Sequence, residues 1–111
     1  MSNPKENIMS LISQSGPNWL TKLSKECNDI IDQDKDLVAP FSEMGLFEKA
    51  YEISSRIDDW AERASGIEGW RECTKSSERK DLGAILVLIL TLCYQRGIDL
   101  AGAIVKYILN K

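Results

Sequence analysis

One helix-length run without charge is the sequence feature that most constrains the fold. No residue from Leu82 to Gln95 is charged, and 11 of the 13 residues from Leu82 to Tyr94 are hydrophobic. A helix of that length rises about 20 Å, which is short of the roughly 30 Å hydrocarbon core of a membrane. Because the run is apolar on every side of a helix, it predicts a core helix that must be covered all round.

The apolar residues elsewhere recur every three or four positions, as in amphipathic helices. We therefore expect helices over about 4–14, 19–31 and 41–65, one from Ser77 or Glu78 to Gly97, and a last one capped by Asp99. No segment alternates with a period of two, so the predicted fold class is all-α, an antiparallel bundle of four to five helices. A chain of 111 residues has room for one core, which predicts a single domain over 1–111.

Charge and composition exclude several classes of function. The chain has 14 basic and 17 acidic residues, so it lacks the basic surface that binds nucleic acid. It has no histidine, which excludes the Ser-His-Asp triad, a histidine general base and zinc sites that contain histidine. We expect neither nucleic acid nor a membrane as a partner.

The cysteines and the N-terminus indicate a cytoplasmic protein. Cys27, Cys73 and Cys93 are odd in number, widely separated and without C-x-x-C spacing, so we expect buried free thiols in a reducing compartment. Lys5 and Glu6 stand where a signal peptide would need an apolar stretch. These features predict a cytoplasmic location.

The helix from Leu82 also carries a prediction about assembly. Four or five short helices leave part of an all-round apolar helix uncovered, and burial of apolar surface stabilises by about 25 cal/mol per Å². We therefore expect a homo-oligomer, a dimer or a tetramer.

The acidic residues have a structural interpretation that comes first. Glu48 and Glu52 are one helical turn apart, but Lys49, Arg56 and Arg63 are near enough to neutralise them, which is typical of a solvated helix face. Glu78 and Asp81 fall in the first turn of their helix, where the helix dipole favours negative charge. The functional alternative is that Glu78 or Asp81 meets an acid of the helix over 41–65 and holds Mg²⁺, which prefers oxygen ligands.

The segment DLGAILVLILTLCYQRGIDLAGAIVKYILNK, which begins at Asp81, resembles the last two helices of the MazG-like, all-α NTP pyrophosphohydrolase superfamily. Members of that superfamily often read E-L-A-D-V-L-I-Y-L-L…G-I-D-L-E-E-A…K, and the resemblance covers about 41–111. It implies a dimer or tetramer in which about four carboxylates between helices bind Mg²⁺. Water then attacks a nucleoside triphosphate, which releases a monophosphate and pyrophosphate.

Aligned through Gly97 to Leu100, the two acidic motifs of the family fall on five positions. Glu-x-x-Asp falls on Asp81 and Ala84, and Glu-Glu-x-x-Glu falls on Ser42, Glu43 and Leu46. The resemblance therefore implies that Glu43 and Asp81 are the catalytic and metal-binding residues, with Glu78 as a further ligand-binding residue. The other three positions have lost the carboxylate, which makes the predicted site degenerate.

Three functions follow from the degenerate site. The favoured hypothesis is a MazG-like fold that binds a nucleotide or another small ligand without efficient hydrolysis, because Leu46 and Ala84 make the pocket more apolar, as in small-ligand sites. The alternative is an Mg²⁺-dependent pyrophosphohydrolase that converts NTP to NMP and pyrophosphate with a rearranged site. The third is an oligomeric protein-interaction module.

The three tryptophans divide into two groups. Trp19 and Trp60 lie on apolar stripes and are expected in the core. Trp70 lies between a glycine and an arginine in an expected loop, so we predict it as a ligand-binding residue that stacks on a base or another aromatic group.

Overall fold

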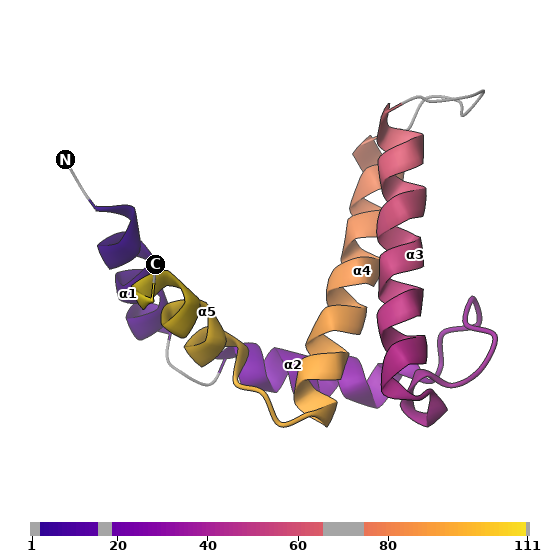
Figure 1. The fold of residues 1–111 in the computed structure, drawn as a ribbon, viewed down its shortest axis with the longest axis horizontal. Helices are drawn as coiled ribbons and strands as arrows, with labels where there is room; N and C mark the ends of the chain where they lie inside the picture. Colours follow the sequence, from indigo (N-terminus) through magenta and orange to yellow (C-terminus); the bar gives the residue numbers. More distant parts are fainter. Residues whose placement is uncertain (1–2, 16–18, 66–74, 111) are drawn as a thin grey trace. The chain divides into compact units, whose positions relative to one another are not determined.

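The described part of the chain is helical throughout. A computed structural model describes residues 3–15, 19–65 and 75–110, and these contain five α-helices, one short 3-10 helix and no strand (Figure 1). The helices are α1 (Pro4–Ser15), α2 (Trp19–Ile31), η1 (Phe41–Glu43), α3 (Leu46–Ser65), α4 (Lys75–Gln95) and α5 (Leu100–Leu109). This confirms the predicted all-α class and the number of helices.

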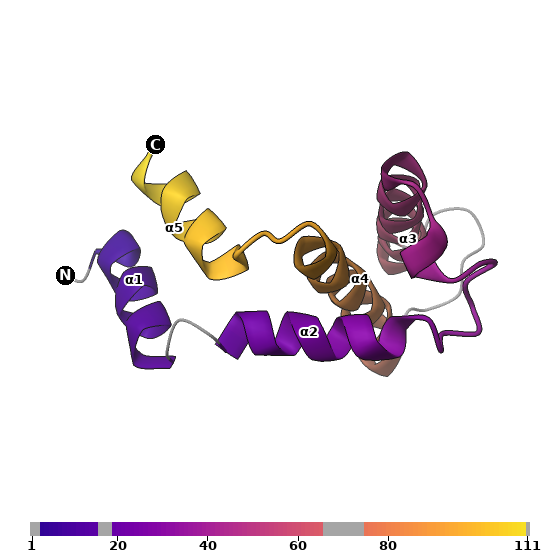
Figure 2. The same ribbon diagram turned by 90° about the horizontal axis from the view of Figure 1, so that it is seen from below.

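The chain divides into two compact units. The first contains the residues up to Asp29 and those from Leu90 onward, and the second is Ile30–Ile89. In the first unit α1 packs against α5, and both views show the two helices next to each other (Figures 1 and 2). The single domain expected from the chain length stays a prediction.

Residues with special backbone roles mark the helix ends of the first unit. The Asn3 Oδ1 atom accepts a hydrogen bond of 2.9 Å from the Lys5 N–H and so caps the start of α1. Gly97 has a φ of +67°, a left-handed conformation that glycine adopts without strain, and it follows the end of α4 as predicted. Its N–H donates to Tyr94 O at 3.1 Å, and the Ile98 N–H donates to Cys93 O at 2.8 Å.

Asp99 does not cap α5 in the way that the sequence predicts. It occupies the capping position, but its side chain makes no capping hydrogen bond. The first turn is closed by the backbone instead, because the Ala103 N–H donates to Asp99 O at 2.9 Å. The capping prediction is therefore wrong for the carboxylate and right for the position.

The helix that was expected to begin at Phe41 begins at Leu46. Phe41 is fully buried and starts the short helix η1, after which Met44 is extended with a ψ of 145°. The carboxylate of Asp32 holds this turn, since it accepts hydrogen bonds from Ser42 Oγ at 2.6 Å and from the Ser42 N–H at 3.1 Å. Continuous apolar spacing across the turn hid the break from the sequence pattern.

α4 begins at Lys75, slightly before the expected Ser77 or Glu78. Its uncharged run is only partly covered within one chain: Ile85 and Leu88 are 5% and 1% exposed, whereas Leu86 is 57% exposed. Among the described residues no single helix is long and apolar enough to cross a membrane. Two consecutive helical segments with a bend between them, Ser77–Gln95 and Leu100–Leu109, are together long and apolar enough, by length and composition only.

Two of the three tryptophans and two of the three cysteines can be compared with the predictions. Trp19 is 46% exposed, so its placement in the core is wrong, because the face of α2 on which it lies is uncovered at that end. Trp60 is half-buried. Cys27 is buried and Cys93 half-buried, both are free thiols as expected, and burial raises the pKa of each. Cys73 lies outside the described residues.

Replacement of Ser42 by alanine tests the turn before α3. The hydroxyl and the backbone N–H of Ser42 both donate to Asp32 and lower the pKa of its carboxyl. A lowered pKa stabilises the fold above the unfolded-state value of about 3.9 and loses this effect as the pH falls through the folded-state value. We expect Ser42→Ala to lower the free energy of unfolding by about 0.5 to 1 kcal/mol at pH 7.

The measurement is urea denaturation of both proteins between pH 7 and pH 2.5. The difference between Ser42→Ala and the wild type should shrink as the pH falls from the unfolded-state pKa of Asp32 toward its lowered folded-state pKa. A difference that stays constant over the whole range would contradict the role given to this carboxylate.

A matched pair of leucines tests how α4 is covered. Leu88→Ala should lower the free energy of unfolding by about 2 to 5 kcal/mol, because Leu88 is 1% exposed and its removal leaves a cavity. Leu86→Ala should cost about 0.5 kcal/mol or less in the monomer, because Leu86 is 57% exposed. Denaturation at several protein concentrations measures both, and a large, concentration-dependent cost for Leu86→Ala would place Leu86 in a subunit interface.

Candidate functional site

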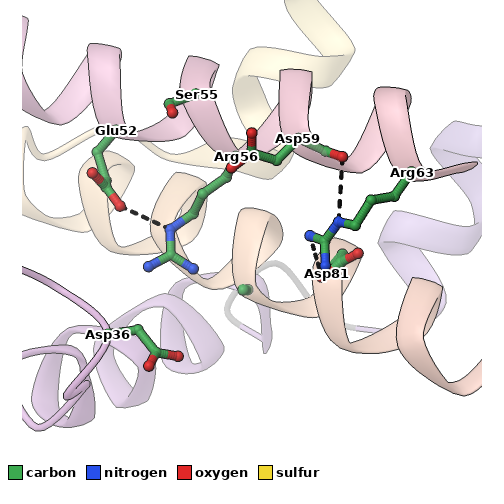
Figure 3. Close-up of a pocket in the computed structure, with 8 residues that line it drawn as sticks. Asp36, Glu52, Ser55, Arg56, Asp59, Arg63 and Asp81 are labelled. Atoms are coloured by element: carbon green, nitrogen blue, oxygen red, sulfur yellow. Dashed lines mark hydrogen bonds and ion pairs between the residues drawn. The ribbon is translucent and has the colours of Figure 1, made fainter. Parts of the chain in front are cut away.

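A charged cavity lies between α3 and the first half of α4, within the second unit. Its volume is about 240 Å³, and nearly all of its lining side chains are polar or charged (Figure 3). The lining consists of four acids, two arginines and two small residues: Asp36, Glu52, Asp59, Asp81, Arg56, Arg63, Ser55 and Ala84. This cavity is the candidate site.

Helical spacing on α3 supplies most of the lining. Glu52, Arg56, Asp59 and Arg63 follow one another at steps of four, three and four residues, so they form one stripe along the helix. Figure 3 shows Glu52, Arg56 and Arg63 extending away from α3, with Arg63 reaching Asp81 of α4. The apolar stripe of the same helix takes different positions, which leaves the charged stripe available to line a cavity.

Arg56 sits in the middle of the site and has two acidic neighbours. Its Nε donates to Glu52 Oε1 at 2.9 Å, one turn earlier on α3. Its Nη2 lies 3.8 Å from Asp34 Oδ2, which is too long for a hydrogen bond but close enough for an ion pair. A guanidinium has five N–H groups, and these two contacts engage only part of them.

Arg63 and Asp81 join the two helices. Arg63 Nη2 lies 2.9 Å from Asp81 Oδ1, and Arg63 Nε donates to the carbonyl oxygen of Asp59 at 3.4 Å. The Asp81 side chain is 15% exposed, and its second oxygen, Oδ2, is buried without a hydrogen-bond partner among the described residues. A buried carboxylate oxygen without a partner is costly, so this atom is ready to accept a donor or a cation.

The formal charge of the lining is negative. Four carboxylates stand against two guanidinium groups, which leaves two net negative charges around the cavity. A small anion by itself would therefore meet net repulsion, although each arginine would attract it locally. A ligand that brings positive charge with its oxygen atoms matches both features.

The predicted site residues occupy different parts of the second unit. Asp81 lines the cavity, and so does Ala84, the position at which the resemblance places a lost acid. Glu78 lies on the first turn of α4 and is half-buried, and Glu43 lies exposed on η1. Neither is among the cavity-lining residues. Trp70 lies outside the described residues.

The sequence interpretation missed the contribution of α3. It treated Glu52, Arg56 and Arg63 as a neutralised, solvated face, and the Glu52–Arg56 pair is indeed present. The same stripe nevertheless lines the cavity, because the opposing helix α4 lies over it. Long-range pairing between two helices is not contained in the spacing within either one.

A spacing in the sequence would have pointed to this part of α3. Asp58, Asp59 and Glu62 are spaced as acid-acid-x-x-acid, and Glu78 and Asp81 as Glu-x-x-Asp. The two MazG-like motifs quoted above have the same spacings. Glu78 and Asp81 stand one helical turn before Asp81 and Ala84, the positions of the Glu-x-x-Asp motif in the alignment through Gly97. Of these five acids, Asp59 and Asp81 line the cavity.

Whether the cavity fits a magnesium ion depends on the other ligands that the ion brings with it. In the part of the chain that the structure describes, no three acidic or cysteine side chains lie close enough to share a metal ion. Mg²⁺ is, however, commonly bound by one or two carboxylates together with substrate phosphates. Asp59 and the unpartnered oxygen of Asp81 fit that arrangement, whereas a site made of protein ligands alone does not.

Comparisons with family models, with curated proteins and with solved structures give no match to this chain. The likeness to MazG-like proteins therefore rests on the quoted residues and motifs alone.

A double-mutant cycle on Arg63 and Asp81 tests whether this pair holds α3 to α4. Both side chains are mostly buried, so Arg63→Gln and Asp81→Asn should each destabilise the protein, and together they should cost less than the sum of the two. We expect a coupling of about 1 kcal/mol.

The control is the Lys25–Asp29 pair on α2, which has the same 2.9 Å distance but is about half-exposed. Its coupling should be smaller and should fall when salt is added. Chemical denaturation measures the coupling energy of each pair. Equal coupling energies would show that the Arg63–Asp81 pair does not hold α3 to α4 more strongly than an exposed ion pair would.

Proposed function

We propose that the protein binds a nucleotide, as its magnesium complex, at the cavity between α3 and α4, without efficient hydrolysis. The observation that carries the proposal is the placement of two arginines and an unpartnered buried carboxylate oxygen in one cavity. Guanidinium groups bind phosphate oxygens through paired N–H donors, so Arg56 and Arg63 are the phosphate-binding residues.

The charge of the cavity supports a metal-bound ligand. The two net negative charges of the lining oppose a bare nucleotide, and one Mg²⁺ ion offsets part of that repulsion. Asp59 and Asp81, two of the carboxylates that line the cavity, would hold such an ion. When bound, the ion neutralises phosphate charge and orients the phosphate chain.

Slow or absent hydrolysis follows from the way Asp81 is held. The Asp81 Oδ1 atom lies 2.9 Å from the Arg63 guanidinium, so one of the two carboxylate oxygens is already engaged and is less available to a cation or a water molecule. Ser55 and Ala84 add no carboxylate to the lining, and no three acidic side chains of the described residues lie close enough to share a metal ion, so a two-metal site is not supported. The site is therefore better suited to holding a nucleotide than to cleaving it.

Binding measurements with and without magnesium test the proposal. Titration calorimetry of ATP, CTP, GTP and UTP in Mg²⁺ should give binding, and the same titrations in EDTA should give at least tenfold weaker binding. Arg56→Gln and Arg63→Gln should each weaken magnesium–nucleotide binding by about tenfold or more, since a charge-assisted hydrogen bond contributes about 1.5 to 3 kcal/mol.

Arg96→Gln serves as the matched control, because Arg96 is an exposed arginine outside the second unit. It should leave the affinity unchanged. Equal losses in all three variants, or no binding of any nucleotide by the wild type, would refute the proposal.

Hydrolysis of a nucleoside triphosphate to a monophosphate and pyrophosphate is the second candidate. The specific observation in its favour is the acid spacing of Asp58, Asp59 and Glu62 on α3 and of Glu78 and Asp81 on α4. In this interpretation the second MazG-like motif stands one helical turn before its place in the alignment through Gly97, and the first motif falls on Asp58, Asp59 and Glu62 instead of Ser42, Glu43 and Leu46. Displacement of Arg63 from Asp81 by the ligand would then release the carboxylate for metal binding.

An assay for monophosphate and pyrophosphate, with Mg²⁺ or Mn²⁺, separates the two candidates and the two alignments. Activity that Asp59→Asn abolishes and Glu43→Gln leaves intact supports hydrolysis with the shifted motifs. Activity that Glu43→Gln abolishes supports the alignment through Gly97. The absence of turnover in a protein that binds nucleotide supports the binding function.

The proposal includes a homo-oligomer. On α3 no residue is fully buried in one chain, and Phe47 and Leu86 are 90% and 57% exposed. Exposed apolar surface of this kind on two neighbouring helices favours association between copies. Sedimentation velocity of the wild type and of Leu86→Glu gives the assembly state and its dependence on α4.

A further inference from the structure

We propose that the groove between α1 and α5 binds α5 of a second copy of the chain, which lies antiparallel to the first. The groove has a volume of about 500 Å³, and all of its lining residues belong to the first unit. It therefore consists of different residues from the charged cavity and from the exposed surface around Phe47 and Leu86, which belong to the second unit.

The groove leaves apolar surface open to water in a single chain. Ile12 of α1 and Ala101, Val105 and Leu109 of α5 supply its apolar wall. Leu109 lines the groove and is nevertheless 58% exposed. An α-helix that lies along such a groove buries this surface, which is a common mode of protein recognition.

Asp99 and Lys106 give the groove a charge pattern that is complementary to itself. Both residues line the groove, and they are seven residues apart, which corresponds to two turns or about 10.5 Å along the axis of α5. The midpoint between them lies between Gly102 and Ala103. A two-fold axis through this midpoint places Asp99 of each copy beside Lys106 of the other copy, so one acid and one base make two attractive contacts.

Charge also decides the direction of the second helix. In a parallel pair, Asp99 would meet Asp99 and Lys106 would meet Lys106, and like charges repel. The antiparallel pair places the positive N-terminal end of one helix dipole beside the negative C-terminal end of the other. A contact about a two-fold axis requires a surface that is complementary to itself, which Asp99 and Lys106 provide.

The Asp99 carboxylate is placed for a contact outside its own helix. It makes no capping hydrogen bond, and it lies against Gly102, where a Cβ atom would come within 2.7 Å of Asp99 Oδ2. Glycine at position 102 therefore leaves room for this carboxylate on the side of the groove. Within the described part of the chain, neither Asp99 nor Lys106 has an ion-pair partner.

The residues at the midpoint allow two helices to approach closely. Gly102 and Ala103 are both exposed in a single chain and have the smallest side chains on α5. The distance between two packed helix axes is about 8 to 10 Å and depends on the side chains at the contact. Small residues at the two-fold axis keep this distance short, so the longer side chains of Asp99 and Lys106 reach the other copy on either side.

Sedimentation velocity of two charge-reversal variants, alone and mixed, tests the antiparallel pair. Asp99→Lys places two positive charges at each contact and Lys106→Asp places two negative charges there, so each variant alone should have half the mass of the wild type. In an equimolar mixture one copy has lysine at both positions and the other has aspartate at both. Each contact then joins opposite charges, and the mixture should return to the wild-type mass.

Lys22→Asp is the matched control, because Lys22 is exposed on α2 in the same unit and the change in net charge equals that of Lys106→Asp. It should keep the wild-type mass. A halved mass in this control overturns the proposal, and so does a mixture that stays at half the wild-type mass. A wild type that is monomeric at every concentration also overturns it, whether the groove then takes another protein, a small apolar ligand or nothing.

Two conservative variants keep the test independent of the folding of α5. Asn is a good residue at the start of a helix and Gln is as favourable as Lys within one, so Asp99→Asn and Lys106→Gln should leave α5 folded. Each removes both attractive contacts of the pair and should weaken association by about threefold to tenfold, measured by sedimentation equilibrium. Unchanged association in both variants overturns the proposal and leaves nucleotide binding, which uses the second unit, untouched.

Discussion

The covering of α4 is the constraint on which the second unit depends. The uncharged run that begins at Leu82 has apolar residues on every side, and Ile85 and Leu88 are almost completely buried. The end of α2 supplies part of this cover, since Ile30 and Ile31 lie beside Ala84 and Val87 around one apolar pocket. α3 lies beside α4 and brings its charged stripe over the first turns of α4 (Figure 1).

This packing explains why a charged cavity exists next to an apolar helix. The charged stripe of α3 adjoins its apolar stripe, and Asp81 and Ala84 on α4 lie where the uncharged run begins. Arg63 meets Asp81 there at 2.9 Å and compensates a carboxylate that is mostly removed from water. The ion pair thus makes the start of α4 compatible with burial.

The local features were the most predictable from the sequence. Helical spacing predicted all five α-helices, and the left-handed Gly97 was predicted at the end of α4 because few other residues adopt that conformation. The break before Leu46 was missed, because apolar spacing runs through it and the hydrogen bonds from Ser42 to Asp32 join residues ten apart. Asp81 was predicted as a site residue from the MazG-like resemblance and lines the cavity, whereas Arg56 and Arg63 were assigned to a solvated surface.

The sequence by itself determined the helices, the charged stripe of α3 and the uncharged run of α4, because each depends on residues that are neighbours along a single helix. Only the tertiary structure decided that Arg63 faces Asp81 and that Glu43 lies apart from the cavity. The physical reason is that a charged pair or a lining side chain depends on which faces of two helices meet. The spacing within each helix leaves that choice open, and the burial of apolar surface between the helices makes it.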